Sequence, residues 1–171
     1  MKVENYKFEI KSFKHLEARS EETNCFSAVL YVNGKKMADC GNSGHGGPTD
    51  ITFFPQYREI EREIEDFLKT QPKIKFENCE FDRTLEYIVD ELVEELLNAK
   101  YLKKLMKKTG QYLIFRNSNE TYYQIGWKKH KVDELLKTPS GRDILKKTIA
   151  NHLANGSILI NENIPSELLP R

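Results

Sequence analysis

The feature that most limits the fold of this chain is the dipeptide Asn33-Gly34, which stands between two segments of strand-like character. Before it, apolar residues occupy every second position, at Phe26, Ala28, Leu30 and Val32. After it, residues 35–39 can return alongside the first segment. Asn-Gly favours a tight two-residue turn, because a type I′ turn requires positive φ at both central positions. The sequence therefore predicts a β-hairpin of residues 26–32 and 35–39.

Hydrophobic periodicity predicts the remaining elements. In the N-terminal half it favours strands over 6–13 and 51–54, a helix over 57–68 and a helix from an N-cap at Asp82 to near Gly110. In the C-terminal half it favours a hairpin of 112–115 with 121–127, a short helix over 132–136, a helix from Thr138-Pro139 to Asn155-Gly156 with Ile144 on its buried face, and an edge strand over 157–160. These elements predict an α+β fold, in which an N-terminal antiparallel hairpin sheet packs against two central helices and a second hairpin and a C-terminal helix follow. Leu85, Leu92, Leu96 and Ala99 belong to the helical stripe expected to lie against the sheet. We expect a single domain of 1–171, with a subdomain boundary near 110 as the alternative.

The predicted hairpin runs directly into a glycine-rich loop, Cys40-Gly41-Asn42-Ser43-Gly44-His45-Gly46-Gly47. Its glycines allow positive φ and a close approach to a ligand, and successive amides in such a loop can bind an anion. The order of residues matches neither a P-loop nor the GxGxxG fingerprint. The loop is therefore either a connector or a contact loop. For the second case, the predicted binding residues are Asn42, Ser43, Gly44, His45, Gly46, Gly47, Thr49 and Asp50.

Cys40 and His45 are the nearest approach to a catalytic pair, because a cysteine nucleophile needs a neighbouring base. No third orienting residue can be assigned, and we predict no catalytic residue. Four histidines without ligand spacing, and three cysteines without a CxxC pair, predict neither a metal site nor a disulfide framework. We expect no cofactor.

A second candidate surface combines basic and aromatic residues: Trp127, Lys128, Lys129 and Lys131. Such a patch would suit a phosphate backbone or an acidic protein. The whole chain has 27 basic and 26 acidic residues, so its net charge of +1 does not indicate nucleic-acid binding. Acidic residues of the first central helix (Glu59, Glu61, Glu63, Glu65 and Asp66) form either a solvated face or an imitation of phosphate.

The composition is that of a folded protein, with 39% hydrophobic and 11% aromatic residues. The N-terminus lacks the apolar stretch of a signal peptide, and no segment is long and apolar enough to span a bilayer. These features predict a cytoplasmic protein that does not enter the membrane.

Residues 26–47, Phe-x-Ala-x-Leu-Tyr-Val-x-Gly-Lys-Lys followed by Gly-Asn-x-Gly-x-Gly-Gly, resemble a segment of small uncharacterised proteins of bacteriophages and mobile elements. The similarity covers about a quarter of the chain, and much of it follows from the hairpin. It implies an accessory protein of a bacterial host cytoplasm that binds and inhibits a host or defence factor. It implies no catalytic residues.

We therefore expect a non-enzymatic protein that binds a macromolecule, with a bacterial protein or protein complex as its partner. One alternative is an enzyme or ligand-binding protein that holds an anionic or nucleotide-like ligand over loop 41–47. Another is a nucleic-acid-binding module that uses Lys128, Lys129 and Lys131. The sequence leaves the oligomeric state open.

Overall fold

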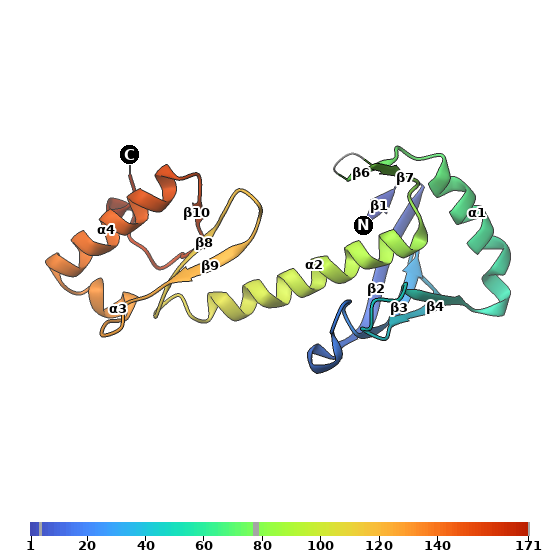
Figure 1. The fold of residues 1–171 in the computed structure, drawn as a ribbon, viewed down its shortest axis with the longest axis horizontal. Helices are drawn as coiled ribbons and strands as arrows, with labels where there is room; N and C mark the ends of the chain where they lie inside the picture. Colours follow the sequence, from blue (N-terminus) through green and yellow to red (C-terminus); the bar gives the residue numbers. More distant parts are fainter. Residues whose placement is uncertain (4, 77–78, 171) are drawn as a thin grey trace. The chain divides into compact units, whose positions relative to one another are not determined.

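The computed structural model describes residues 1–3, 5–76 and 79–170 and shows an α+β protein, as predicted (Figure 1). Its contacts divide the chain into two compact units, Met1–Leu96 and Leu97–Arg171. The helix α2 begins in the first unit and ends in the second. Division at Leu96 places the boundary earlier than Gly110. Whether the two units unfold together as one cooperative domain stays a prediction.

The first unit contains a five-stranded antiparallel sheet in which sequence neighbours lie side by side, in the order β1-β2-β3-β4-β5. Its elements are β1 (Lys2–Val3), β2 (Tyr6–His15), β3 (Phe26–Val32), β4 (Lys35–Asn42), β5 (Asp50–Phe53), α1 (Arg58–Lys69), the small hairpin β6 (Ile74–Phe76) with β7 (Cys79–Phe81), and the first part of α2 (Leu85–Met106). The strands β1, β6 and β7 were not predicted, because two or three residues are too few to show an alternating pattern.

The predicted Asn-Gly turn joins β3 to β4, and both residues have positive φ, 50° for Asn33 and 78° for Gly34. The Lys7 amide donates a hydrogen bond to Asn33 Oδ1 at 2.8 Å, so the turn is also attached to β2. The returning strand extends to Asn42 rather than to Asp39. Cys40, Gly41 and Asn42, which were predicted in the loop, are therefore strand residues, and the loop comprises residues 43–49.

Two helices complete the first core, as predicted. The helix α1 buries Ile64 and Leu68, and the ring of Phe67 lies 5.1 Å from that of Tyr6 on β2. The helix α2 buries Leu85, Ile88, Val89, Leu92 and Val93. The prediction that its apolar stripe continues through Leu96 and Ala99 is wrong, since both are exposed. The unit boundary falls at this point of the helix, and the stripe loses its packing partners there.

The predicted cap of α2 is also wrong. The Tyr87 amide donates to Thr84 Oγ1 at 3.1 Å, so Thr84 caps the helix, and Asp82 instead forms an ion pair with Lys73. The helix ends at Met106 and not near Gly110. Two turns of backbone hydrogen bonds follow it, because the amides of Gln111 and Tyr112 both donate to the Lys108 carbonyl.

The second unit contains a three-stranded sheet in the order β10-β8-β9 and a core of its own. Its elements after α2 are β8 (Leu113–Arg116), β9 (Tyr122–Ile125), α3 (Val132–Leu135), α4 (Pro139–Ala154) and β10 (Ile158–Leu159). Its core consists of Leu113, Phe115, Val132, Leu135, Leu145, Ile149, Ile164 and Leu168. The Gly141 amide donates to the hydroxyl of Thr138, which confirms the predicted N-cap of α4. Ile144 is exposed, and its predicted burial is wrong.

The buried side-chain amide of Asn161 connects two segments of the second unit. Asn161 Oδ1 accepts a hydrogen bond from the Ile114 amide at 2.6 Å. Asn161 Nδ2 donates to the carbonyl oxygens of Tyr112 and Thr109 at 2.9 and 3.1 Å. This side chain therefore attaches the segment after β10 to the start of β8.

Candidate functional site

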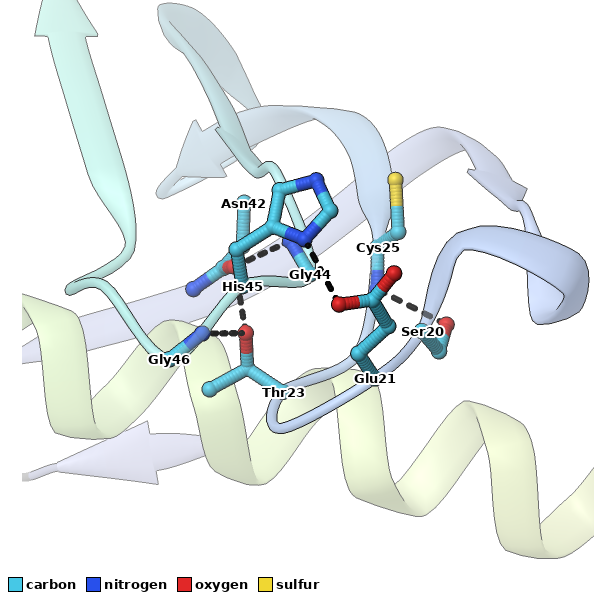
Figure 2. Close-up of polar contacts among 8 residues, drawn as sticks. All are labelled: Ser20, Glu21, Thr23, Cys25, Asn42, Gly44, His45 and Gly46. Carbon is cyan, nitrogen blue, oxygen red and sulfur yellow. Dashed lines mark hydrogen bonds and ion pairs between the residues drawn. The ribbon is translucent and has the colours of Figure 1, made fainter.

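The glycine-rich loop of residues 43–49 lies against residues 19–25, which belong to the connection between β2 and β3 (Figure 2). The carbonyl oxygen of Gly44 accepts hydrogen bonds from the amides of Glu21, Glu22 and Thr23, at 3.0, 3.1 and 3.4 Å. Three successive amides thus point at a single oxygen of the loop. This group of contacts holds the two segments together.

Asn42 organises the loop with its side chain. Its Oδ1 accepts from Thr23 Oγ1 at 2.7 Å and from the Gly44 amide at 2.9 Å. Its Nδ2 donates to the Gly47 carbonyl at 2.9 Å and to Thr49 Oγ1 at 3.3 Å. Because Asn42 is buried, losing these partners would leave polar groups without water.

Two of the loop glycines are required by the backbone. Gly44 and Gly46 have φ of +91° and +81°, a region that L side chains rarely adopt. A Cβ on Gly44 would lie 2.2 Å from the Arg19 carbonyl oxygen, whereas a Cβ on Gly46 would meet only the flexible side chain of Glu22. A Cβ on Gly47 would have no described atom within 4 Å. The role of Gly44 and Gly46 is therefore first of all to let the loop pack against residues 19–25 of the same chain.

Two backbone amides of the loop that could bind an anion already donate hydrogen bonds to side chains of the protein. The Gly44 amide donates to Asn42, and the Gly46 amide donates to Thr23 Oγ1 at 3.3 Å. An anion-binding loop keeps such groups directed at the ligand. The arrangement disfavours the alternative in which loop 41–47 holds an anionic or nucleotide-like ligand.

Cys40 and His45 have different environments. Cys40 is buried on β4, and its burial, together with the charges of Asp39 and Asp90, raises the pKa of the thiol to about 11. His45 is exposed, and its Nδ1 lies 3.2 Å from a carboxylate oxygen of Glu21. In the described part of the chain, no hydrogen bond joins the thiol to the imidazole. A nucleophilic cysteine needs the opposite shift, toward thiolate.

The burial of Cys40 predicts a simple order of thiol reactivity. All three cysteines are free, but Cys79 is exposed while Cys25 and Cys40 are buried. At pH 8 a thiol of pKa about 11 is only about 0.1% thiolate, and thiolate is the reactive form. We expect iodoacetamide to label Cys79 in the native protein, and Cys40 and Cys25 only in urea, as followed by peptide mass spectrometry. Native labelling of Cys40 as fast as that of Cys79 would contradict this environment.

The far end of the loop is attached to α2. The Thr49 amide donates to Glu86 Oε1 at 2.9 Å, and the Thr49 hydroxyl donates to Asp90 Oδ1 at 2.6 Å. One turn further, Asn24 Nδ2 donates to Glu94 Oε1 at 2.8 Å. Glu86, Asp90 and Glu94 are four residues apart, so they lie on one face of the helix. This face of α2 therefore binds both the end of the loop, at Thr49, and the segment of residues 19–25, at Asn24.

Between these elements lies an open cavity of about 470 Å³ that we call the acidic groove. Four carboxylates line it, those of Glu22, Glu86, Asp90 and Glu94; the other lining residues are Thr23, Asn24, Phe26, Asn42, Gly46, Gly47, Pro48, Thr49 and Val93. Among the described residues, this lining includes no lysine, arginine or histidine. Burial, with the charges of Glu86 and Glu94, raises the pKa of Asp90, although the Thr49 hydroxyl acts against this shift. The groove is thus a site of concentrated negative charge.

The structure distributes the predicted loop residues over different environments. Asn42, Gly46, Gly47 and Thr49 line the acidic groove. Gly44 is buried in the contact with residues 19–25, while Ser43, His45 and Asp50 are exposed elsewhere on the described surface. The binding roles of these eight residues stay predictions. Glu86, Asp90 and Glu94 were not predicted as a group, although their four-residue spacing is visible in the sequence and marks one face of an acidic helix half.

The second predicted surface lies in the other unit. Trp127, Lys128, Lys129 and Lys131 line a smaller cavity of about 260 Å³, together with Gln111, Tyr112, His130 and Glu134. The binding role of the four predicted residues likewise stays a prediction.

The division into units changes the interpretation of net charge. Residues 1–96 contain 13 basic and 20 acidic side chains, a net charge of −7, and residues 97–171 contain 14 basic and 6 acidic side chains, a net charge of +8. The overall value of +1 is the sum of two opposite charges. The near-neutral charge of the whole chain therefore does not speak against nucleic-acid binding by the second unit alone.

Two kinds of feature are absent from the described residues. Within residues 1–3, 5–76 and 79–170, no group of three or more His, Cys, Asp or Glu side chains is arranged to hold a metal ion. Over the same residues, no helix combines the length and the apolar character needed to cross a membrane.

Comparisons with protein-family models, with curated proteins and with solved structures give no match for this chain. The function is therefore inferred from the chemistry of its own residues.

Proposed function

We propose that this chain is a non-enzymatic binding protein whose acidic groove engages a basic surface of a partner protein. The observation that supports this proposal is the gathering of four carboxylates around one open cavity. In the described part of the chain, none of the four forms an ion pair with a basic side chain. Their charge is available to a partner.

The repulsion between these carboxylates destabilises α2. Like charges four residues apart destabilise a helix by about 0.2–0.5 kcal/mol per pair, and the groove-lining residues of α2 form two such pairs, Glu86–Asp90 and Asp90–Glu94. Lysine or arginine side chains entering the groove would relieve this repulsion. The net charge of −7 on the first unit would also increase the rate of encounter with a basic partner.

The loop contacts support binding rather than catalysis. The loop of residues 43–49 is fixed by Asn42 and Thr49, so the wall of the groove is formed before a partner arrives. A preformed wall reduces the entropy lost on association. The raised pKa of the buried Cys40 thiol argues against its use as a nucleophile beside the loop.

For the partner, we propose a bacterial protein that itself binds nucleic acid, because such proteins present the clustered basic residues that the groove would accept. The resemblance of residues 26–47 to phage and mobile-element proteins motivates this choice, and inhibition of a host or defence factor is the corresponding biological role. A complex of fixed stoichiometry is expected, and no turnover.

The test compares wild type with Glu22→Gln/Glu94→Gln, which removes two groove charges and keeps side-chain size. Glutamine at 94 can still accept from Asn24. The probe is a fluorescein-labelled peptide of ten lysines, and binding is measured by anisotropy from about 50 to about 300 mM NaCl. Exposed ion pairs contribute about 0.2–1 kcal/mol each, so we expect the double variant to bind about 2- to 30-fold more weakly. The same proteins are then used to capture partners from bacterial lysate.

The matched control is Glu59→Gln/Glu63→Gln on α1, which makes the same change of net charge at two exposed positions outside the groove. This variant should bind the peptide and capture the partner as wild type does. Equal weakening by both variants would mean that only the overall charge attracts the probe, and the groove proposal would then fail. Capture of no stoichiometric partner by wild type would exclude the inhibitor role.

A further inference from the structure

The second unit has a strong positive charge, which the neutrality of the whole chain conceals. Its net charge is +8 over residues 97–171. Five of its lysines, Lys100, Lys103, Lys104, Lys107 and Lys108, belong to the end of α2 and the turn after it. A basic excess of this size within one compact unit is characteristic of proteins that bind nucleic acid. The chemistry of this unit is therefore distinct from that of the acidic groove.

Three further lysines of this unit line one cavity. The cavity of about 260 Å³ lies between the turn that precedes β8 and the segment that connects β9 to α3. Lys128, Lys129 and Lys131 line it, and in the described residues none of the three forms an ion pair with a carboxylate. The one acidic residue of the lining, Glu134, accepts a hydrogen bond from the Lys131 amide at 3.0 Å and caps α3.

Two aromatic rings share this cavity with the lysines. Tyr112 is placed by the hydrogen bond from its amide to Lys108, and its ring lies against Gly126, where a Cβ would come within 2.5 Å of Tyr112 Cδ1. Trp127 packs on the core of the unit and is half-buried. Both rings are thus held in place while part of their surface remains accessible. Fixed aromatic faces beside cationic side chains are the elements with which proteins bind single strands.

The open shape of the cavity favours part of a polymer over an enclosed small molecule. Pockets for drug-sized ligands bury most of the ligand surface, whereas this cavity of about 260 Å³ is open to solvent. A base would occupy it while the sugar-phosphate chain passes outside, beside the lysines.

We infer that this cavity is a binding site for single-stranded nucleic acid, in which Lys128, Lys129 and Lys131 contact phosphates and the rings of Tyr112 and Trp127 stack with bases. The site lies in a different unit from the acidic groove and does not rest on the proposed function. Stacking on aromatic faces is tolerant of sequence, so the expected binding has little base preference.

The single tryptophan of the chain, Trp127, makes a direct measurement available. The probe is the oligonucleotide dT12, and stacking of a base on the indole should quench its fluorescence saturably. Single strands give a slope of about −0.7 per phosphate contact in a plot of log K against log salt, so three lysine contacts predict a slope of about −2. The monomer dTMP should bind far more weakly, because it offers one phosphate.

The variant Lys128→Gln/Lys129→Gln should weaken dT12 binding by about 10- to 30-fold at about 0.1 M salt and reduce the slope to about −0.7. Its matched control is Lys146→Gln/Lys147→Gln on α4, two exposed lysines outside the cavity, which should change affinity less than about threefold. Thermal unfolding confirms that both variants are folded.

Three results would overturn the inference. One is the absence of quenching by dT12 at about 50 mM salt. Another is equal weakening by the two lysine pairs, which would show a diffuse attraction without a site. The third is equal quenching by a peptide of ten glutamates, which would identify the cavity as a surface for an acidic protein.

Discussion

Gly44→Ala should lower the free energy of unfolding by about 3 kcal/mol, the largest effect that we expect in the loop. An L residue at φ +91° costs roughly 1–2 kcal/mol. The new Cβ would in addition lie 2.2 Å from the Arg19 carbonyl oxygen and 2.8 Å from Cys25 Cβ. Because the first of these is a backbone atom, the loop must move, and the three hydrogen bonds to the Gly44 carbonyl are lost with it. If the first unit, Met1–Leu96, unfolds by itself, the conversion of about 4–8 °C per kcal/mol gives a fall in melting temperature of roughly 12 °C or more by far-UV circular dichroism; if both units unfold together, about 2–4 °C per kcal/mol gives roughly 6–12 °C.

The neighbouring glycines provide graded controls for this prediction. Gly46→Ala has a strained φ but meets only the flexible Glu22 side chain, so we expect a loss of about 1 kcal/mol. Gly47→Ala has neither a positive φ nor a described neighbour within 4 Å, and its effect should stay within about 0.5 kcal/mol. If the three alanine variants were equally stable, the docking of the loop on residues 19–25 would be refuted.

Asn161→Ala should destabilise the second unit by about 3 kcal/mol. The truncation leaves the buried Ile114 amide without an acceptor and removes the donor to the Thr109 and Tyr112 carbonyls, and each buried group left unpaired costs about 1–3 kcal/mol. Urea unfolding followed by the fluorescence of Trp127 measures this effect in the right unit, because Trp127 packs on its core.

Two further substitutions separate the hydrogen bonds from side-chain volume. Asn161→Asp keeps the size and the acceptor for Ile114 but cannot donate to the two carbonyls, so it should destabilise at least as much as alanine does. Asn163→Ala removes an exposed side chain that contacts the same Thr109 carbonyl at 3.3 Å, and it should cost only about 0.5 kcal/mol. An Asn161→Asp variant as stable as wild type would show that the donor hydrogen bonds contribute nothing.

The features that could be predicted from the sequence are those set by neighbouring residues. The turn at Asn33-Gly34 and the cap at Thr138 each depend on a few consecutive positions, and both are present. Local signals fail where two residues can fill the same role. Asp82 and Thr84 are both suitable N-caps, and the helix begins after Thr84 rather than after the predicted Asp82.

The features that could not be predicted depend on contacts between distant residues. The hydrogen bond of Asn42 with Thr23 spans 19 positions, that of Thr49 with Glu86 spans 37, and that of Asn161 with Ile114 spans 47. No periodicity or motif contains such pairings. The glycine-rich loop was therefore recognised as unusual, while the carboxylates that share its cavity were not predicted as part of the same site. The opposite charges of the two units were missed because the boundary lies inside one continuous helix, although the change from acidic residues before Leu96 to lysines from Lys100 onward is visible in the sequence.

The placement of Asn161, Ile164 and Leu168 in the second core has a consequence for how the chain is made. Each buried hydrophobic residue of the first unit precedes Leu96, so that unit has its full core early in synthesis. At about 5–20 residues per second, the ribosome needs roughly 4 to 14 s more to reach Leu168. During this interval the strands of the second unit exist without the residues that cover them. The nascent second unit then exposes the apolar residues of its core, and we expect a chaperone to bind there.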